Sequence, residues 1–227
     1  MGNTFIGSSL ENKIEIGEPF HQKNVIDPSI FSWNELERIL NLRPFVNSSR
    51  LRLLNSKSYR WTAGWWLSDR DTYPPKLLHK EVKNCVSVLH DCSRINESIN
   101  SLCGELEKIT KFPTDTHIFF SFRKGEEGLN AHQDDSHNLI LLLDGMVNFK
   151  IWEKENPLDK YYDPSVNVDM SSGDVVYIPA NVYHQSTPLS DKKLSLSFPM
   201  SISGDICEDR HWTVSYTHLR AHETGRN

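Results

Sequence analysis

The hydrophobic periodicity of the chain changes at Thr116, and no other feature of the sequence constrains the fold as strongly. Between Pro75 and Thr110, apolar residues recur at the three- and four-residue spacing of amphipathic helices. After Thr116 the apolar residues come in short runs, separated by loops of Asn, Asp, Gly and Pro. These runs predict strands at 116–123, 137–143, 147–152, 166–170, 174–178 and 193–198. Short strands at such intervals are typical of a β-sandwich or a β-barrel.

The N-terminal part of the chain is expected to be mainly helical. Residues 1–28 are polar and should form an irregular lead-in. A helix should begin after Ser32, because a serine followed three residues later by Glu35 forms a capping box. Residues 51–54 predict a short strand. The two apolar stripes between residues 75 and 110 predict helices that cover one face of the sheet.

A single domain is expected, since β-barrels and sandwiches often reach a length of 227 residues undivided. We place this domain at residues 29–213, with a helical part at 29–112 and a β core at 113–203. Residues 214–227 resemble translated sequencing-adapter read-through and are treated as a non-native tail. The histidines in this tail are therefore not interpreted as metal ligands.

The composition argues against several classes of partner. The net charge of −5 and the pI near 6.1 provide no basic surface for nucleic acid. No apolar run reaches the length of a membrane span, and the N-terminus lacks the pattern of a secretory signal. The four cysteines have neither zinc-site spacing nor the density of a disulfide framework. These features favour a reduced, cytoplasmic protein.

Two motifs about fifty residues apart supply a candidate metal site. The first, His132-x-Asp134, places an imidazole and a carboxylate on one face of an extended segment. The second places His184 after a Gly-Asp turn, an apolar strand and a proline, at the mouth of the barrel. Two histidines and one carboxylate form the facial triad that binds non-haem Fe(II) and leaves coordination positions open. We therefore predict that His132, Asp134 and His184 are the catalytic metal ligands.

Other candidate ligands rank below this triad. Asp135 is the second candidate for the carboxylate ligand, because its side chain should point to the opposite face from that of Asp134. His79 has an acidic residue at the same spacing but no strand pattern around it, which indicates a solvated helix face. His117 and His137 are expected to be hydrogen-bonded strand residues.

The order of the two motifs resembles the JmjC and cupin-like family of Fe(II)- and 2-oxoglutarate-dependent oxygenases, in the branch of ribosomal-protein and asparaginyl hydroxylases. The likeness runs from about Phe20 to Ser203. As in that family, an apolar strand follows the His-x-Asp block and ends at Asp144-Gly145, and the block before His184 reads Gly-Asp-x-x-Tyr-x-Pro. The resemblance implies a double-stranded β-helix, or jelly roll, with iron at its open end.

The same resemblance implies an enzyme that hydroxylates or demethylates a side chain. The expected substrate is a protein or peptide, with a small molecule as the other class. Relatives often dimerise, so a homodimer is expected as well.

The resemblance also implies a buried cation for the far carboxylate of the co-substrate, 2-oxoglutarate. Many relatives carry Lys or Arg fifteen residues after the first histidine, where this chain has Val147. Lys193, with Ser195 two residues on, matches the place where other 2-oxoglutarate oxygenases have a basic residue and a hydroxyl. We rank this pair before Lys150, which has the opposite strand parity. Asn138 matches an asparagine that contacts the co-substrate in the asparaginyl hydroxylases.

Two other functions remain open from the sequence. Val147 at the usual cation position favours a metal-dependent cupin enzyme that does not use 2-oxoglutarate. A non-catalytic binding module with the cupin fold is the third hypothesis. Three neighbouring tryptophans, Trp61, Trp65 and Trp66, are consistent with a substrate pocket, a cation cage or simple core packing.

Overall fold

The structure, a computed structural model, describes residues 5–42, 50–55, 60–61, 75–124, 130–153 and 163–201. The helices are α1 (Ser8–Ile16), the 3-10 helix η1 (Pro28–Ile30), α2 (Trp33–Leu40), α3 (Pro75–Val82) and α4 (Glu97–Thr110). The strands are β1 (Phe20–Gln22), β2 (Leu51–Asn55), β3 (Arg60–Trp61), β4 (Val86–Leu89), β5 (His117–Ser121), β6 (Ser136–Asp144), β7 (Met146–Trp152), β8 (Val166–Ser171), β9 (Val175–Ile178), β10 (Tyr183–Pro188) and β11 (Lys193–Ser201). Within these ranges, no helix is both long enough and apolar enough to cross a membrane.

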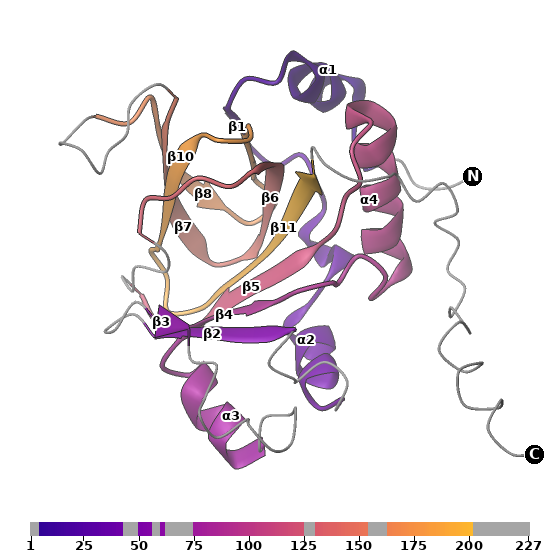
Figure 1. The fold of residues 1–227 in the computed structure, drawn as a ribbon. Coiled ribbons are helices and arrows are strands. Elements are labelled where there is room, and N and C mark those ends of the chain that lie inside the picture. The colour runs from indigo at the N-terminus through magenta and orange to yellow at the C-terminus, as the bar shows by residue number, and fades with distance from the viewer. Residues whose placement is uncertain are drawn as a thin grey trace, which may run out of the picture.

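Two antiparallel sheets face each other in the β core (Figure 1). The larger sheet has the order β1-β9-β6-β11-β5-β4-β2-β3, and the smaller has the order β10-β7-β8. Ile140 and Val176 of the larger sheet and Phe149 and Met170 of the smaller sheet belong to one buried cluster, which we call the inner cluster. The arrangement confirms the predicted mainly β fold with a jelly-roll core.

Strand β6 is buried on both of its faces. Ile140 and Leu142 belong to the inner cluster, whereas Leu139 and Leu141 belong to a second cluster that also includes Leu102 of helix α4. We call this second cluster the outer cluster; α4 lies on the side of the large sheet away from β7, β8 and β10 (Figure 1). Burial on both faces explains why this strand has a nearly continuous apolar sequence instead of alternation. The burial of β6 also holds the segment just before this strand, which carries the His132-x-Asp134 motif, at one end of the core.

The capping box predicted at the start of α2 is confirmed. The Ser32 hydroxyl accepts a hydrogen bond from the Glu35 backbone N–H at 3.3 Å, and the Glu35 carboxylate accepts one from the Ser32 N–H at 2.8 Å. These two bonds satisfy backbone donors that a helix start otherwise leaves unpaired.

The expectation of an irregular lead-in is wrong for residues 8–22, which form α1 and β1. Leu10 and Ile14, one helical turn apart, are buried in the outer cluster even though most of their neighbours are polar. Strand β1 pairs with β9, so it becomes the edge strand of the large sheet. The Asp174 carboxylate accepts a hydrogen bond from the Asn24 backbone N–H at 2.9 Å, which helps to hold this segment in place.

Strands β4 and β10 also lie where the sequence did not predict strands. Val86 to Leu89 were expected to be part of a helical stripe, but they form β4, which pairs with β2 and β5 and is buried on both faces. Pairing on both sides outweighs a local pattern that also fits a helix. His184 was expected just beyond a strand, but it lies within β10, whose polar sequence has no apolar alternation. The region at 29–112 therefore contains the strands β2, β3 and β4 in addition to its helices.

Gly145, which joins β6 to β7, is expected to tolerate no side chain. Its φ of 89° lies in the region that favours glycine, and an added Cβ would overlap the carbonyl oxygen of Lys192. Gly145→Ala should therefore lower the free energy of unfolding by about 2 kcal/mol or more, measured by urea denaturation. Gly104→Ala is the control, because this helical glycine has open space around it and should gain up to about 1 kcal/mol. Equal stability of the two variants would contradict this hairpin geometry.

Candidate metal centre

His132 and His184 are brought together by backbone pairing. The two residues form an isolated antiparallel bridge, in which the His132 N–H donates to the His184 carbonyl at 3.1 Å and the His184 N–H donates to the His132 carbonyl at 2.8 Å. Residues that face each other in such a pair place their side chains on the same side. The ring centroids accordingly lie 4.3 Å apart.

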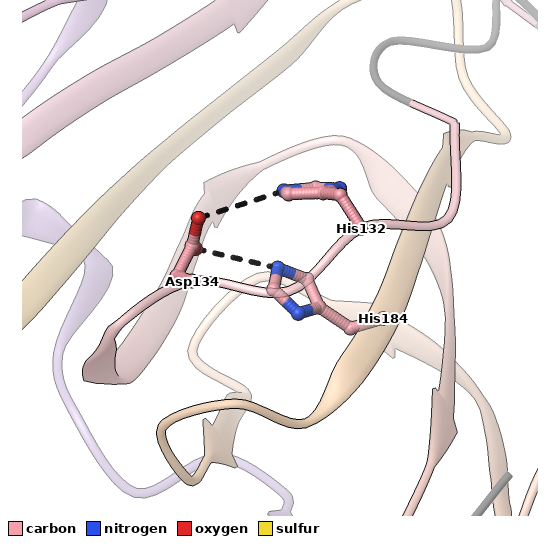
Figure 2. Close-up of side chains that lie close together, drawn as sticks. All are labelled: His132, Asp134 and His184. Atoms are coloured by element: carbon pink, nitrogen blue, oxygen red, sulfur yellow. Dashed lines mark ion pairs between the residues drawn. The ribbon is translucent and has the colours of Figure 1, made fainter. Parts of the chain in front are cut away.

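Asp134 completes a three-residue cluster with the two imidazoles (Figure 2). One carboxylate oxygen lies 4.0 Å from His132 Nε2 and the other lies 3.6 Å from His184 Nε2. Among the described residues this is the one group of three whose donor atoms lie within 4.8 Å of one another. A first-row divalent ion about 2.1 Å from each donor brings neighbouring donors to about 3 Å, so ångström-scale side-chain movement is enough to coordinate it.

The second nitrogen of each imidazole is bonded to a backbone carbonyl. His132 Nδ1 lies 2.8 Å from the Asn130 carbonyl oxygen, and His184 Nδ1 lies 3.0 Å from that of Val182. Because a carbonyl only accepts, each Nδ1 carries the hydrogen and each Nε2 has a free lone pair toward Asp134. Burial, followed by the nearby His132, lowers the pKa of His184, so this imidazole is neutral at pH 7. The donor set thus fits a divalent metal such as Fe(II).

The loop between β9 and β10 holds the Asp134 backbone in place. The Asn181 N–H donates to the Asp134 carbonyl at 2.7 Å, and the Gln133 side-chain amide donates to the Asn181 carbonyl at 2.9 Å. Asn181 adopts a φ of 61°, a left-handed conformation that asparagine tolerates better than most residues. The segment that carries the carboxylate is therefore fixed to the strand that carries His184.

The structure places Lys193, Ser195 and Asn138 on the inner face of the large sheet. Ser195 pairs with Leu142, which belongs to the inner cluster, and Lys193 lies two residues before it on the same side of β11. Asn138 is 7% exposed, and its side-chain oxygen accepts a hydrogen bond from Ser197 at 2.7 Å. These residues thus face the space between the two sheets, and Asn138 does not face solvent.

Lys193 is buried without a compensating carboxylate among the described residues. Its residue is 5% exposed, and no ion pair involves it within the described part of the chain. Its ammonium lies 5.9 Å from the centroid of the Phe119 ring. Burial lowers the pKa of this lysine to about 8. A buried ammonium without an anion is unfavourable, so this position suits an anionic ligand.

The remaining candidates do not belong to the three-residue cluster. Lys150 is on β7 between Phe149 and Ile151, whose side chains point inward, so it lies on the outer face. Asp135 and His79 are exposed. His137 lies 2.9 Å from the Tyr177 hydroxyl, and the His117 ring packs against that of His90. The side chain of Trp61, together with Trp65, Trp66 and the C-terminal tail, lies outside the described residues.

Comparison with protein-family models identifies the family of this chain. Residues 89–205, more than half of the chain, match the JmjC domain family. The chain belongs to this family. No curated protein matches it in sequence.

Solved structures of the Escherichia coli ribosomal oxygenase YcfD share the fold of this JmjC domain. One is 19% identical with a TM-score of 0.60, covering 82% of this chain and 48% of YcfD. Another, in complex with cobalt and 2-oxoglutarate, is 18% identical with a TM-score of 0.59, covering 82% of this chain and 49% of YcfD. The chain therefore spans about half the length of YcfD.

Sequence reasoning did not single out Ser121, which the structure places beside Lys193. Ser121 is the last residue of β5 and lies directly across from Lys193 on β11. It belongs to no motif, and the two residues are far apart in the chain. Only the strand register connects them.

Proposed function

We propose that this JmjC domain is an Fe(II)- and 2-oxoglutarate-dependent oxygenase that hydroxylates a side chain of a protein or peptide. The observation that carries the proposal is the convergence of His132 Nε2, Asp134 and His184 Nε2 on one point at the rim of the jelly roll. YcfD, which shares the fold, is described as a ribosomal oxygenase, and this supports a protein substrate. A cytoplasmic location and a homodimer stay predictions.

His132, Asp134 and His184 would hold the ion and would leave coordination positions for co-substrate and dioxygen. Bound there, iron and 2-oxoglutarate supply the oxidising chemistry that inserts oxygen into a C–H bond. The chain itself holds both imidazoles in the Nδ1–H tautomer through the carbonyls of Asn130 and Val182. The Asn181 backbone keeps the segment that carries Asp134 from shifting. These contacts preserve the ligand geometry during turnover.

Lys193 and Ser195 are the proposed anchor for the far carboxylate of 2-oxoglutarate. A bound carboxylate provides the counter-charge that the buried ammonium lacks within the described residues. Lys150 does not suit this role, because its strand position faces outward. Asn138 is proposed to turn its amide N–H group toward the co-substrate, since its oxygen already accepts from Ser197.

Calorimetry with N-oxalylglycine, a mimic of 2-oxoglutarate that does not turn over, tests the proposal directly. Protein loaded with Mn(II) should bind the mimic, and metal-free protein should bind it far more weakly. With Fe(II), the protein should convert 2-oxoglutarate to succinate, detected by NMR. If metal-loaded protein does not bind the mimic, the cupin enzyme that works without 2-oxoglutarate becomes the better description, in line with Val147 at the usual cation position.

A further inference from the structure

The loop between β9 and β10, residues 179–182, contacts two of the three candidate metal ligands through its backbone. The Asn181 N–H donates to the Asp134 carbonyl at 2.7 Å, and the Val182 carbonyl oxygen lies 3.0 Å from Nδ1 of His184. The loop therefore sets both the position of the Asp134 backbone and the rotation of the His184 ring. A shift of the loop would move both ligands.

The side chain of His137 ties this loop to β6. His137 lies on that strand, and its Nδ1 accepts a hydrogen bond from the Ala180 backbone N–H at 3.4 Å. The Tyr177 hydroxyl lies 2.9 Å from the same nitrogen. Because a backbone N–H only donates, Nδ1 of His137 carries no hydrogen, and the Tyr177 hydroxyl also donates to it. The loop is thus held at the residue next to Asn181.

The surroundings of His137 keep its ring in this role. The ring stacks on that of Phe112, with centroids 5.4 Å apart, and on that of Tyr177, with centroids 6.0 Å apart. Burial lowers the pKa of His137, so the imidazole is neutral at pH 7 and its Nδ1 can accept. His132 and His184 have the opposite tautomer, in which Nδ1 carries the hydrogen. His137 therefore serves as an acceptor for the loop and not as a metal ligand.

We propose that His137 is a positioning residue of the metal centre, which acts on Asp134 and His184 through the backbone of residues 179–182. This inference rests on the proposed function and adds a residue that touches none of the metal ligands directly. Without the acceptor, the Ala180 N–H must turn toward another partner such as water, because a buried backbone donor is unfavourable when unpaired. The loop then leaves the geometry that holds the ligands together, and metal binding has to restore it.

Leucine and asparagine at position 137 separate this role from packing. The two side chains have nearly the same shape, and both lack the ring that stacks on Phe112. Asparagine Oδ1 takes the place of histidine Nδ1, so only His137→Asn keeps an acceptor for the Ala180 N–H. Calorimetry of Mn(II) binding, without turnover, should show about a 10-fold loss of affinity for His137→Leu, the lower end of the effect of residues that orient metal ligands. His137→Asn should recover most of this loss.

Tyr177→Phe is the matched control within the same group of contacts. It removes the other donor to His137 Nδ1, but it leaves the bond from the Ala180 N–H and the ring stack on Phe20. This variant should bind Mn(II) as the wild-type protein does. Urea denaturation of each variant measures the free energy of unfolding, so a general loss of stability can be told apart from a change at the metal centre.

Several outcomes overturn the inference. Wild-type Mn(II) affinity of His137→Leu would remove His137 from this role, and equal losses in His137→Leu and His137→Asn would assign the effect to packing. A loss in Tyr177→Phe as large as that in His137→Leu would assign it to the hydroxyl instead of the loop. If the leucine variant does not fold, His137→Phe, which keeps the ring but not the acceptor, takes its place. The proposed function fails in a different way, because then the wild-type protein itself does not bind Mn(II), or does not bind N-oxalylglycine once it is loaded.

Discussion

Lys193→Met is expected to make the protein more stable at pH 7 while removing tight binding of 2-oxoglutarate. The stability gain follows from the burial of an ammonium that has no counter-charge in the described structure. The pKa of this lysine falls from 10.5 to about 8 in the folded state. Such a shift corresponds to about 3 kcal/mol of destabilisation, which methionine, of similar shape, removes.

The gain in stability from Lys193→Met should depend on pH in a defined direction. Between about pH 8 and 10.5 the unfolded chain binds the lysine proton and the folded chain does not, so the wild-type protein becomes more stable as the pH rises. The destabilisation of the wild-type protein by the buried Lys193 ammonium is fully present below pH 8. The advantage of Lys193→Met should therefore be largest at pH 7 and nearly gone at pH 10.5, measured by urea denaturation at each pH.

Lys192→Met is the control for this stability effect, because Lys192 is the exposed neighbour of Lys193. This variant should change the free energy of unfolding by no more than about 0.5 kcal/mol. If Lys193→Met instead destabilises the protein at pH 7, the ammonium must have a partner that satisfies its charge. The proposed anionic ligand would then lose its physical basis.

The binding half of the prediction concerns the same substitution. Removing one member of a buried charge pair costs about 3–5 kcal/mol, which corresponds to more than a 100-fold loss of affinity. Calorimetry with N-oxalylglycine on Mn(II)-loaded Lys193→Met should show this loss. Mn(II) affinity should be unchanged, because Lys193 is not a ligand. Retained affinity for the mimic would mean that another cation anchors the far carboxylate.

His132→Ala is expected to abolish conversion of 2-oxoglutarate to succinate. Loss of a metal ligand should cost more than the 10- to 100-fold that is typical for residues that only support a ligand. The side chain of His132 is 32% exposed and lies at the rim, so the variant should fold normally. Succinate is measured by NMR, and bound metal is measured on the dialysed protein.

His79→Ala provides the matched control for this substitution. His79 also has an acidic residue two positions on, but it is exposed on helix α3. It should keep full activity and metal content. Turnover that survives in His132→Ala would exclude the three-residue cluster as the iron site, whatever its geometry.

The sequence alone was sufficient to predict that His132, Asp134 and His184 form one cluster. The His-x-Asp spacing and the Gly-Asp strand before His184 are local patterns. Such patterns can be recognised from the order of residues alone. The strands β5 to β9 and β11 were predicted for the same reason, because their apolar side chains recur at strand spacing. By contrast, β4 was read as helix, since Val86 and Leu89 fit both periods and only pairing with β2 and β5 decides between them.

Three features were decided by tertiary structure. Strand β10 is polar, so its composition does not predict that it pairs with β7 and places His184 next to His132. The carbonyls of Asn130 and Val182, which orient the two imidazoles, are backbone atoms, so the residue types at these positions do not predict their role. The proximity of Ser121 and Lys193 depends on strand register, which sets the two residues opposite each other across 72 positions of chain. The periodicity of side chains is a property of residues that are close in sequence, so it can be read from the sequence. Strand register is set by hydrogen bonds between distant segments, so only the folded structure reveals the register.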